Sequence, residues 1–578
     1  MKYMILNIIA WICVLFVIAT GVIKGGKVDD SRTEIIHIGK SVPAADGETG
    51  NAVAPDNPTI DQARPSAADI PAAEALDTDD RTSAAPEAVR LNDSAAALMG
   101  AGEISAAVTL LKRSLLIDSL YARAHYNLGL AYHKGNQMKD AIDEYTRAIA
   151  LRPYYYNPVY NLGLLYYDIA DYEQALAWFR KAVGIKKSAE TASAYYNMGL
   201  AYERLKNSGE AESAYKEALR LKPGYVEARY NLALLRMEEG KYRDAVEDFE
   251  KTAALGLKKR KLYTNIGICY ANLDRNENAM RAYQEAVTVA PDDPKGWFNL
   301  ALSFNRLGQA QKAIEAYHKA LSLDSTYSEA SFNLAMLYAD QNSGDSAITH
   351  YRQAIAQNPR YSKAYFNLGL LYGGKSQYDS AAACYSKVVE LDPENLKAQF
   401  NLGVAYGQLD RLDDAAQAYQ GVLDQDPVNE KALNNLGTVY LKLEDYDSAY
   451  VCFNRLVGLT HSATAYFNRA KANNELGRPE DATKDYRKAI EADSKYGKAY
   501  HNLALLEEES GNQLEAIELL KKAASYDSDS WRSHWKLGQI YHSMGLLDNA
   551  REEYAFAAAS KPDSKKFKRE YDELFNQR

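Results

Sequence analysis

Residues Ala122 to Tyr155 read ARAHYNLGLAYHKGNQMKDAIDEYTRAIALRPYY, and this stretch of 34 residues decides the fold. Small residues at Gly129 and Ala141 would let two antiparallel helices approach closely, because a larger side chain would overpack the contact. Pro153 follows the second segment and would end its helix. The stretch therefore predicts one helix-turn-helix unit.

The unit recurs along most of the chain with a period of 34 residues. A two-residue insertion (Glu190, Thr191) and a one-residue deletion before Ala463 are the interruptions of the register. The repeats cover residues 88–564, about four-fifths of the 578 residues. By this alignment fourteen repeats start at residues 88, 122, 156, 192, 226, 260, 294, 328, 362, 396, 430, 463, 497 and 531.

Three repeat positions predict how the units pack. Position 20 is alanine in all fourteen copies, position 8 is Gly or Ala in every copy, and position 24 is Tyr or Phe in twelve. Small residues at positions 8 and 20 favour close helix pairs, and the ring at position 24 would fill the space between neighbouring units. Units that bury their faces only on their neighbours stack into a solenoid.

The pattern resembles the tetratricopeptide repeat. Leu128, Gly129, Tyr132, Ala141, Tyr145, Ala148 and Pro153 stand at the positions of that family's motif. The resemblance implies an all-α, right-handed superhelical solenoid of about fourteen helix-turn-helix repeats, with the first helix of each repeat on the concave side. Residues 565–578 are expected to form a C-terminal capping helix, because Phe567, Tyr571, Leu574 and Phe575 have the spacing of one apolar stripe.

Residues 1–27 predict an N-terminal membrane anchor. Residues 3–23 contain no charge, and as a helix they would span about 31 Å, which matches the bilayer hydrocarbon. The alternative is a cleaved signal peptide with its cleavage site at Ala19-Thr20-Gly21, although the apolar segment is longer than such peptides carry. A single-pass membrane protein is expected, with the side of the membrane left open because lysines flank both ends of the segment.

Residues 28–87 predict a disordered, acidic, Ala/Pro-rich linker. They hold six of the chain's 16 prolines, no aromatic residue, and 13 acidic against 4 basic residues. Such a composition cannot bury enough apolar surface to fold. The folded repeats are therefore expected to hang from the anchor on a flexible tether.

Composition and motifs argue against several classes of function. The net charge of -9 disfavours a nucleic-acid-binding protein, whose footprint is normally basic. Four cysteines lie far apart, and the nine histidines show no metal-ligand spacing, so neither a metal nor another cofactor is expected. No catalytic residues are predicted. The chain ends fourteen residues after its last repeat, so an associated enzyme would be a separate polypeptide.

Repeat position 6 carries the strongest functional signal. It is asparagine in twelve consecutive copies: Asn127, Asn161, Asn197, Asn231, Asn265, Asn299, Asn333, Asn367, Asn401, Asn435, Asn468 and Asn502. Asparagine inside a helix is about 0.6 kcal/mol worse than alanine, so a compensating role is required. The row is similar to the asparagine ladder of the tetratricopeptide superhelix of O-GlcNAc transferase, whose catalytic domain has no counterpart here. One amide per repeat could hold an extended polypeptide, or could bond a neighbouring helix.

Lysines at position 2 extend this candidate peptide site between residues 260 and 462. Five of the six repeats have lysine there, one helical turn before the asparagine, and Glu329 interrupts the run. These lysines would favour acidic segments. The predicted peptide-binding residues are Asn265, Asn299, Asn333, Asn367, Asn401, Asn435, Lys261, Lys295, Lys363, Lys397 and Lys431.

The sequence thus predicts a non-catalytic, membrane-tethered scaffold that binds extended segments of other proteins in its concave groove. Two alternatives stay open. The chain could be a structural protein that self-associates into an oligomer, or a regulatory subunit of a separate membrane-associated enzyme. The identity of the partner and the oligomeric state are left open by the sequence.

Overall fold

A computed structural model describes residues 84–185, 191–526, 530–560 and 571. Across these ranges the chain consists of α-helices joined by short turns, without a β-strand. The predicted anchor at residues 3–23, most of the linker and all but Tyr571 of the predicted cap lie outside the described residues. Among the helices that are described, none has both the length and the apolar character needed to cross a membrane.

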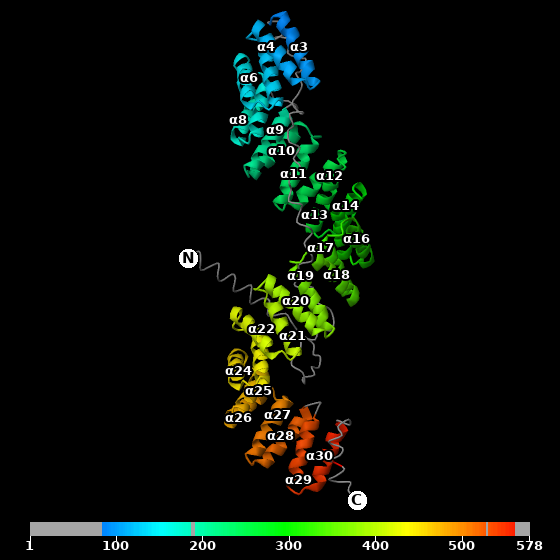
Figure 1. Cartoon of the computed structure of the whole chain (residues 1–578), viewed down its shortest axis with the longest axis vertical. Helices are drawn as coiled ribbons and strands as arrows, with labels where there is room; N and C mark the ends of the chain where they lie inside the picture. The colour runs from blue at the N-terminus through cyan, green and yellow to red at the C-terminus, as the bar shows by residue number, and fades with distance from the viewer. Residues whose placement is uncertain (1–83, 186–190, 527–529, 561–570, 572–578) are drawn as a thin grey trace. The chain divides into compact units, whose positions relative to one another are not determined.

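The chain divides into two compact units. Among the described residues, the N-terminal unit covers residues 84–337 and the C-terminal unit residues 338–571, with the boundary inside α17 (Ser328–Asp340). In each unit the helices follow one another as antiparallel pairs, as Figure 1 shows.

The helices that precede α17 belong to the N-terminal unit. They are α3 (Pro86–Gly100), α4 (Ile104–Ile117), α5 (Ala122–Lys134), α6 (Met138–Leu151), α7 (Tyr156–Asp168), α8 (Tyr172–Ile185), α9 (Ala192–Arg204), α10 (Ser208–Leu221), α11 (Val226–Glu238), α12 (Tyr242–Ala254), α13 (Arg260–Asn272), α14 (Asn276–Val289), α15 (Pro294–Arg306) and α16 (Ala310–Leu323).

The helices that follow α17 belong to the C-terminal unit. They are α18 (Gly344–Gln357), α19 (Ser362–Gly374), α20 (Tyr378–Leu391), α21 (Leu396–Gln408), α22 (Leu412–Gln425), α23 (Glu430–Lys442), α24 (Tyr446–Thr460), α25 (Ala463–Glu475), α26 (Pro479–Ala492), α27 (Gly497–Glu509), α28 (Gln513–Tyr526), α29 (Trp531–Ser543) and α30 (Leu547–Ser560).

The helix boundaries follow the sequence period closely. In thirteen of the fourteen pairs the first helix begins at the residue where the alignment places the start of a repeat. The exception is α3, which begins at Pro86 rather than at Ala88. Proline is favoured in the first turn of a helix, because its missing N–H would have no partner there. The predicted all-α solenoid of helix-turn-helix repeats is thus confirmed, and its right-handed sense stays a prediction.

The turn inside each pair has one conformation throughout. The residue at repeat position 15 has a positive φ, between 57° and 86°, in each of the fourteen turns. In the turn after α5, the Asn136 N–H donates to the His133 carbonyl and the Gln137 N–H to the Tyr132 carbonyl, at 3.0 and 2.8 Å. These bonds satisfy carbonyls that the helix end leaves without a partner. The repeated turn sets the same antiparallel geometry in every repeat.

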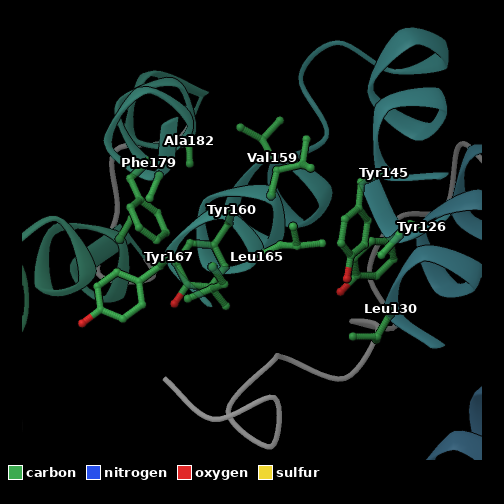
Figure 2. Packing of buried hydrophobic residues seen from close by; sticks show 14 of the residues in the cluster. Tyr126, Leu130, Tyr145, Val159, Tyr160, Leu165, Tyr167, Phe179 and Ala182 are labelled. Atoms are coloured by element: carbon green, nitrogen blue, oxygen red, sulfur yellow. The ribbon is translucent and has the colours of Figure 1, made fainter. Parts of the chain in front are cut away.

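In twelve of the fourteen repeats, an aromatic ring at position 24 packs against the glycine or alanine at position 8. Tyr145 and Phe179, both at position 24, are fully buried, and their rings lie 6.1 and 5.8 Å from those of Tyr126 and Tyr160 (Figure 2). The alanines at position 20 are also fully buried, as Ala141 and Ala175 illustrate. Because proteins pack at crystal density, this leaves no space for a larger residue at positions 8 and 20.

One interface of the N-terminal unit is charged instead of apolar. Arg236 stands at position 11, which is tyrosine in most repeats, and it donates to Glu212 at 2.9 and 3.1 Å and to Asp248 at 2.6 Å. Arg229 also donates to Asp248 at 3.1 Å, and Asp248 is only 5% exposed. The network joins α10, α11 and α12, and so couples two neighbouring repeats.

Candidate functional site

The first helices of successive pairs form an inner row, which is the surface that could hold an extended ligand. Direct contacts join α3 to α5, α5 to α7 and α7 to α9 in the N-terminal unit, and α23 to α25 in the C-terminal unit. First helices that touch across the intervening second helix lie on the inner side of a curved stack. The position-6 asparagines lie in this row.

In the N-terminal unit the asparagine amides connect neighbouring repeats. Asn127, Asn161, Asn197 and Asn231 are between 0 and 5% exposed. Each side chain donates to the position-5 residue of the preceding repeat, and so does that of the half-buried Asn265. The donor–acceptor pairs are Asn127 to Asn92 at 2.7 Å, Asn161 to Tyr126 at 3.3 Å, Asn197 to Tyr160 at 2.7 Å, Asn231 to Tyr196 at 3.3 Å and Asn265 to Tyr230 at 3.4 Å.

In the C-terminal unit the same asparagines are half-buried. Asn468 still donates to the position-5 residue of the preceding repeat, Asn434, at 2.8 Å, whereas three others use another partner. Asn367, Asn435 and Asn502 donate to the position-24 tyrosines Tyr351, Tyr419 and Tyr486, at 3.3, 3.2 and 3.2 Å. The Oδ1 atoms of Asn367 and Asn401 accept no hydrogen bond from the described part of the chain. Their amide oxygens are therefore available to a ligand.

The change of partner follows from the residue at position 5. Tyr126, Tyr160, Tyr196 and Tyr230 offer a hydroxyl to the next asparagine, whereas Phe332, Phe400 and Phe467 have none. In these three repeats the amide donates to the position-24 hydroxyl instead. The choice between tyrosine and phenylalanine at position 5 is visible in the sequence, and it is the signal that separates these two groups of asparagines.

The structure thus separates the predicted site residues into three sets by their exposure. Asn299 and Asn333 are buried, 5 and 8% exposed, and the Asn333 side chain donates to the Glu329 carbonyl of its own helix at 2.8 Å. Asn265, Asn367, Asn401 and Asn435 are half-buried and lie at the surface of the inner row. The position-2 lysines Lys261, Lys295, Lys363, Lys397 and Lys431 are all exposed.

The described cysteines lie in packed environments. Cys269, Cys384 and Cys452 are buried and free. Burial raises the pKa of the Cys269 thiol to about 12 and those of Cys384 and Cys452 to about 11. Such thiols are protonated at neutral pH and are poor nucleophiles. Within the described ranges, no cluster of His, Cys, Asp and Glu has the arrangement of a metal site.

Family models of the tetratricopeptide repeat match most of the chain. They match residues 122–155, 156–224, 230–294, 294–327, 366–430, 434–496 and 501–565, and a TPR repeat model matches residues 336–376. The chain belongs to the tetratricopeptide repeat family. It is therefore a repeat scaffold, as the spacing of its small and aromatic residues predicts.

Individual relatives are similar over parts of the chain. The peroxisomal targeting signal receptor of Eremothecium gossypii is 36% identical over 75 residues, which are 13% of this chain and 13% of the receptor. The chain thus aligns with about an eighth of that curated relative's length.

Solved structures also resemble parts of the fold. The crystal structure of MamA protein is 27% identical with a TM-score of 0.28, covering 29% of this chain and 92% of that one. YrrB, described as a TPR protein with an unusual peptide-binding site, is 22% identical with a TM-score of 0.30, covering 34% and 97%. Yeast Tom70 is 18% identical with a TM-score of 0.27, covering 77% and 96%.

Proposed function

We propose that this chain is a scaffold that binds extended polypeptide segments on the inner row of its first helices. The observation that carries the proposal is the spacing of Asn367, Asn401 and Asn435, half-buried amides on α19, α21 and α23 of the C-terminal unit. Each amide stands one repeat from the next, so a chain lying along the row would meet one after another. An amide oxygen accepts from a peptide N–H whatever the side chain, which favours a sequence-tolerant ligand.

Exposed lysines give the proposed site its charge preference. Lys363, Lys397 and Lys431 each stand one helical turn before one of these asparagines. In the N-terminal unit, Lys261 and Asn265 repeat the arrangement on α13. We propose segments rich in glutamate and aspartate as the preferred ligands. The ammonium groups of these lysines attract such segments and steer their approach.

The proposal is tested by changing Asn367, Asn401 and Asn435 to alanine together in the full chain. A fluorescent peptide of glycine, serine and glutamate serves as the probe, and its anisotropy reports binding. We expect binding to fall about tenfold or more, at a loss of roughly 0.5–1.5 kcal/mol for each hydrogen bond. The melting temperature should change little, because these side chains are half-exposed.

The matched control changes Asn127, Asn161 and Asn197 to alanine. These buried amides bridge repeats, so we expect this variant to melt lower and to bind the probe as the parent does. If the first variant melts much lower than the parent, or binds the probe unchanged, the asparagines of the C-terminal unit are structural and the proposal is wrong.

We further propose that residues 3–23 anchor the scaffold in a membrane. The support is the uncharged segment of 21 residues and the acidic linker that follows it. We expect the native protein to retain its N-terminus and to be extracted from membranes by detergent but not by high salt. A mature protein that starts near Val22 would contradict the anchor and indicate a cleaved signal peptide.

A further inference from the structure

Neighbouring first helices meet through the same two repeat positions. His133, at position 12 of α5, lies 3.1 Å from the Asp168 carboxylate, at position 13 of α7, measured between Nε2 and Oδ2. One interface further, the Arg204 Nε, at position 13 of α9, donates to the Tyr167 hydroxyl, at position 12 of α7, at 3.4 Å. In both interfaces the two facing groups are complementary.

The third interface places two like charges at these positions. Glu203, at position 12 of α9, and Glu238, at position 13 of α11, line one cavity of about 180 Å³ on the inner row. The other lining residues are Lys206, Ser208, Asn231, Leu234 and Leu235. Two carboxylates on one cavity repel each other and favour a bound cation.

The cavity wall adds a further acceptor. Asn231 is only 5% exposed, and its Nδ2 donates to the Tyr196 hydroxyl at 3.3 Å. Its Oδ1 accepts no hydrogen bond from the described residues and remains available to the cavity. Because Asn231 lines the cavity, a donor on a bound ligand could reach this oxygen.

The carboxylate of Glu238 has no cationic partner inside the described part of the protein. Lys206, on the turn after α9, lines the same cavity but forms no ion pair with Glu238. Burial raises the pKa of Glu238, because it disfavours the charged form of the carboxylate. The charge of Glu238 is thus left for a ligand to neutralise.

We propose that this cavity binds the ammonium group of a lysine side chain carried by the bound polypeptide. An ammonium has three donors and no acceptor, which matches the two carboxylates and the amide oxygen of Asn231. Leu234 and Leu235 provide an apolar wall for the methylene stem of the lysine. The inference rests on the proposed binding of polypeptides to the inner row, and it adds a site for one basic residue to a row whose lysines favour acidic segments.

The test compares two fluorescent peptides of glycine and serine that differ at one central residue. One carries lysine and the other norleucine, which keeps the stem and lacks the charge. We expect the full chain to bind the lysine peptide about tenfold more tightly, as for a charge-assisted hydrogen bond, with the preference weakening as salt is added.

The variant Glu203→Gln/Glu238→Gln should lose this preference. The matched control is Glu239→Gln, which removes an adjacent carboxylate that already pairs with Lys241 at 2.8 Å, and it should keep the preference. The double variant should melt no lower than the parent, because glutamine keeps an oxygen that can accept from the Tyr215 hydroxyl beside Glu203 and relieves the repulsion between the two carboxylates. A lower melting temperature, or a preference that survives in the double variant, would overturn the inference.

The acidic probe peptide separates this inference from the proposed function. If the parent binds the acidic probe but does not distinguish lysine from norleucine, the lysine site is wrong and the asparagine site stands. If the parent binds none of the three peptides, both proposals fail.

Discussion

Replacing Arg236 by methionine is expected to lower the free energy of unfolding of α10–α12 by about 3 kcal/mol, because it breaks a buried ion-pair network. Methionine would keep much of the apolar stem, so the loss comes mainly from the charge. Asp248, at 5% exposed, would retain Arg229 alone, and Glu212 would lose two of its hydrogen bonds. Hydrogen exchange of the amides in these three helices measures the local free energy.

The control is Arg220→Met, which removes one partner of a solvent-exposed ion pair. Arg220 and Glu217 are 65 and 41% exposed and lie 2.9 Å apart. An exposed pair of this kind contributes about 0–1 kcal/mol, so exchange should barely change. If both substitutions have equal effects, the network does not hold the two repeats together.

The decrease in the free energy of unfolding of the Arg236→Met variant should also depend on pH. Burial alone would raise the pKa of Glu212, but hydrogen bonds from Lys216, Arg236 and Lys241 outweigh it and lower the pKa to about 2. A depressed pKa stabilises the fold above the pKa of the unfolded chain, about 4.3, and this contribution is lost as the pH falls towards 2. The difference in the free energy of unfolding between parent and variant should therefore become smaller as the pH falls from 7 to 2.

The period of the sequence was sufficient to predict the fold. Alanine at position 20 and Gly or Ala at position 8 leave one way to pair two helices, and thirteen first helices begin where the alignment places them. The exception at Pro86 lies outside the repeat pattern, in a residue whose preference for a helix start is local. Strong periodicity and local propensity agree in this chain, which is why the predicted repeat starts coincide with the first residues of thirteen helices.

The candidate site could be predicted only in part, because side-chain partners depend on contacts between repeats. Asn161 and Asn367 occupy the same position of the same motif, yet one is fully buried on Tyr126 and the other is half-exposed beside Tyr351. A single hydroxyl, present in Tyr126 and absent from Phe332, separates the two cases. The contact between positions 12 and 13 of neighbouring repeats could not be predicted from the sequence either, because it joins residues 35 positions apart.

A valine at Gly437 is expected to destabilise its repeat by about 3 kcal/mol, at the upper end of the cost of overpacking a core. A Cβ atom at this residue would lie 2.7 Å from the ring of Phe453, which is fully buried and cannot move into solvent. The two further carbons of valine would enter the same space between α23 and α24. Chemical denaturation, followed by circular dichroism, measures the loss.

Two further substitutions in the same repeat serve as a control and as a smaller change at Gly437. Gly458 lies on α24 of the same repeat, and a Cβ atom there would meet nothing within 4 Å, so Gly458→Val should stay within about 0.5 kcal/mol of the parent. Gly437→Ala should cost less than valine, because other repeats carry alanine at position 8, as at Ala301. Equal destabilisation by valine at Gly437 and Gly458 would show that the ring at position 24 does not set the distance between the two helices. A loss confined to Gly437 would mean that the ring of Phe453 limits the side chain at position 8 of this repeat, since close packing leaves no volume into which the ring could move.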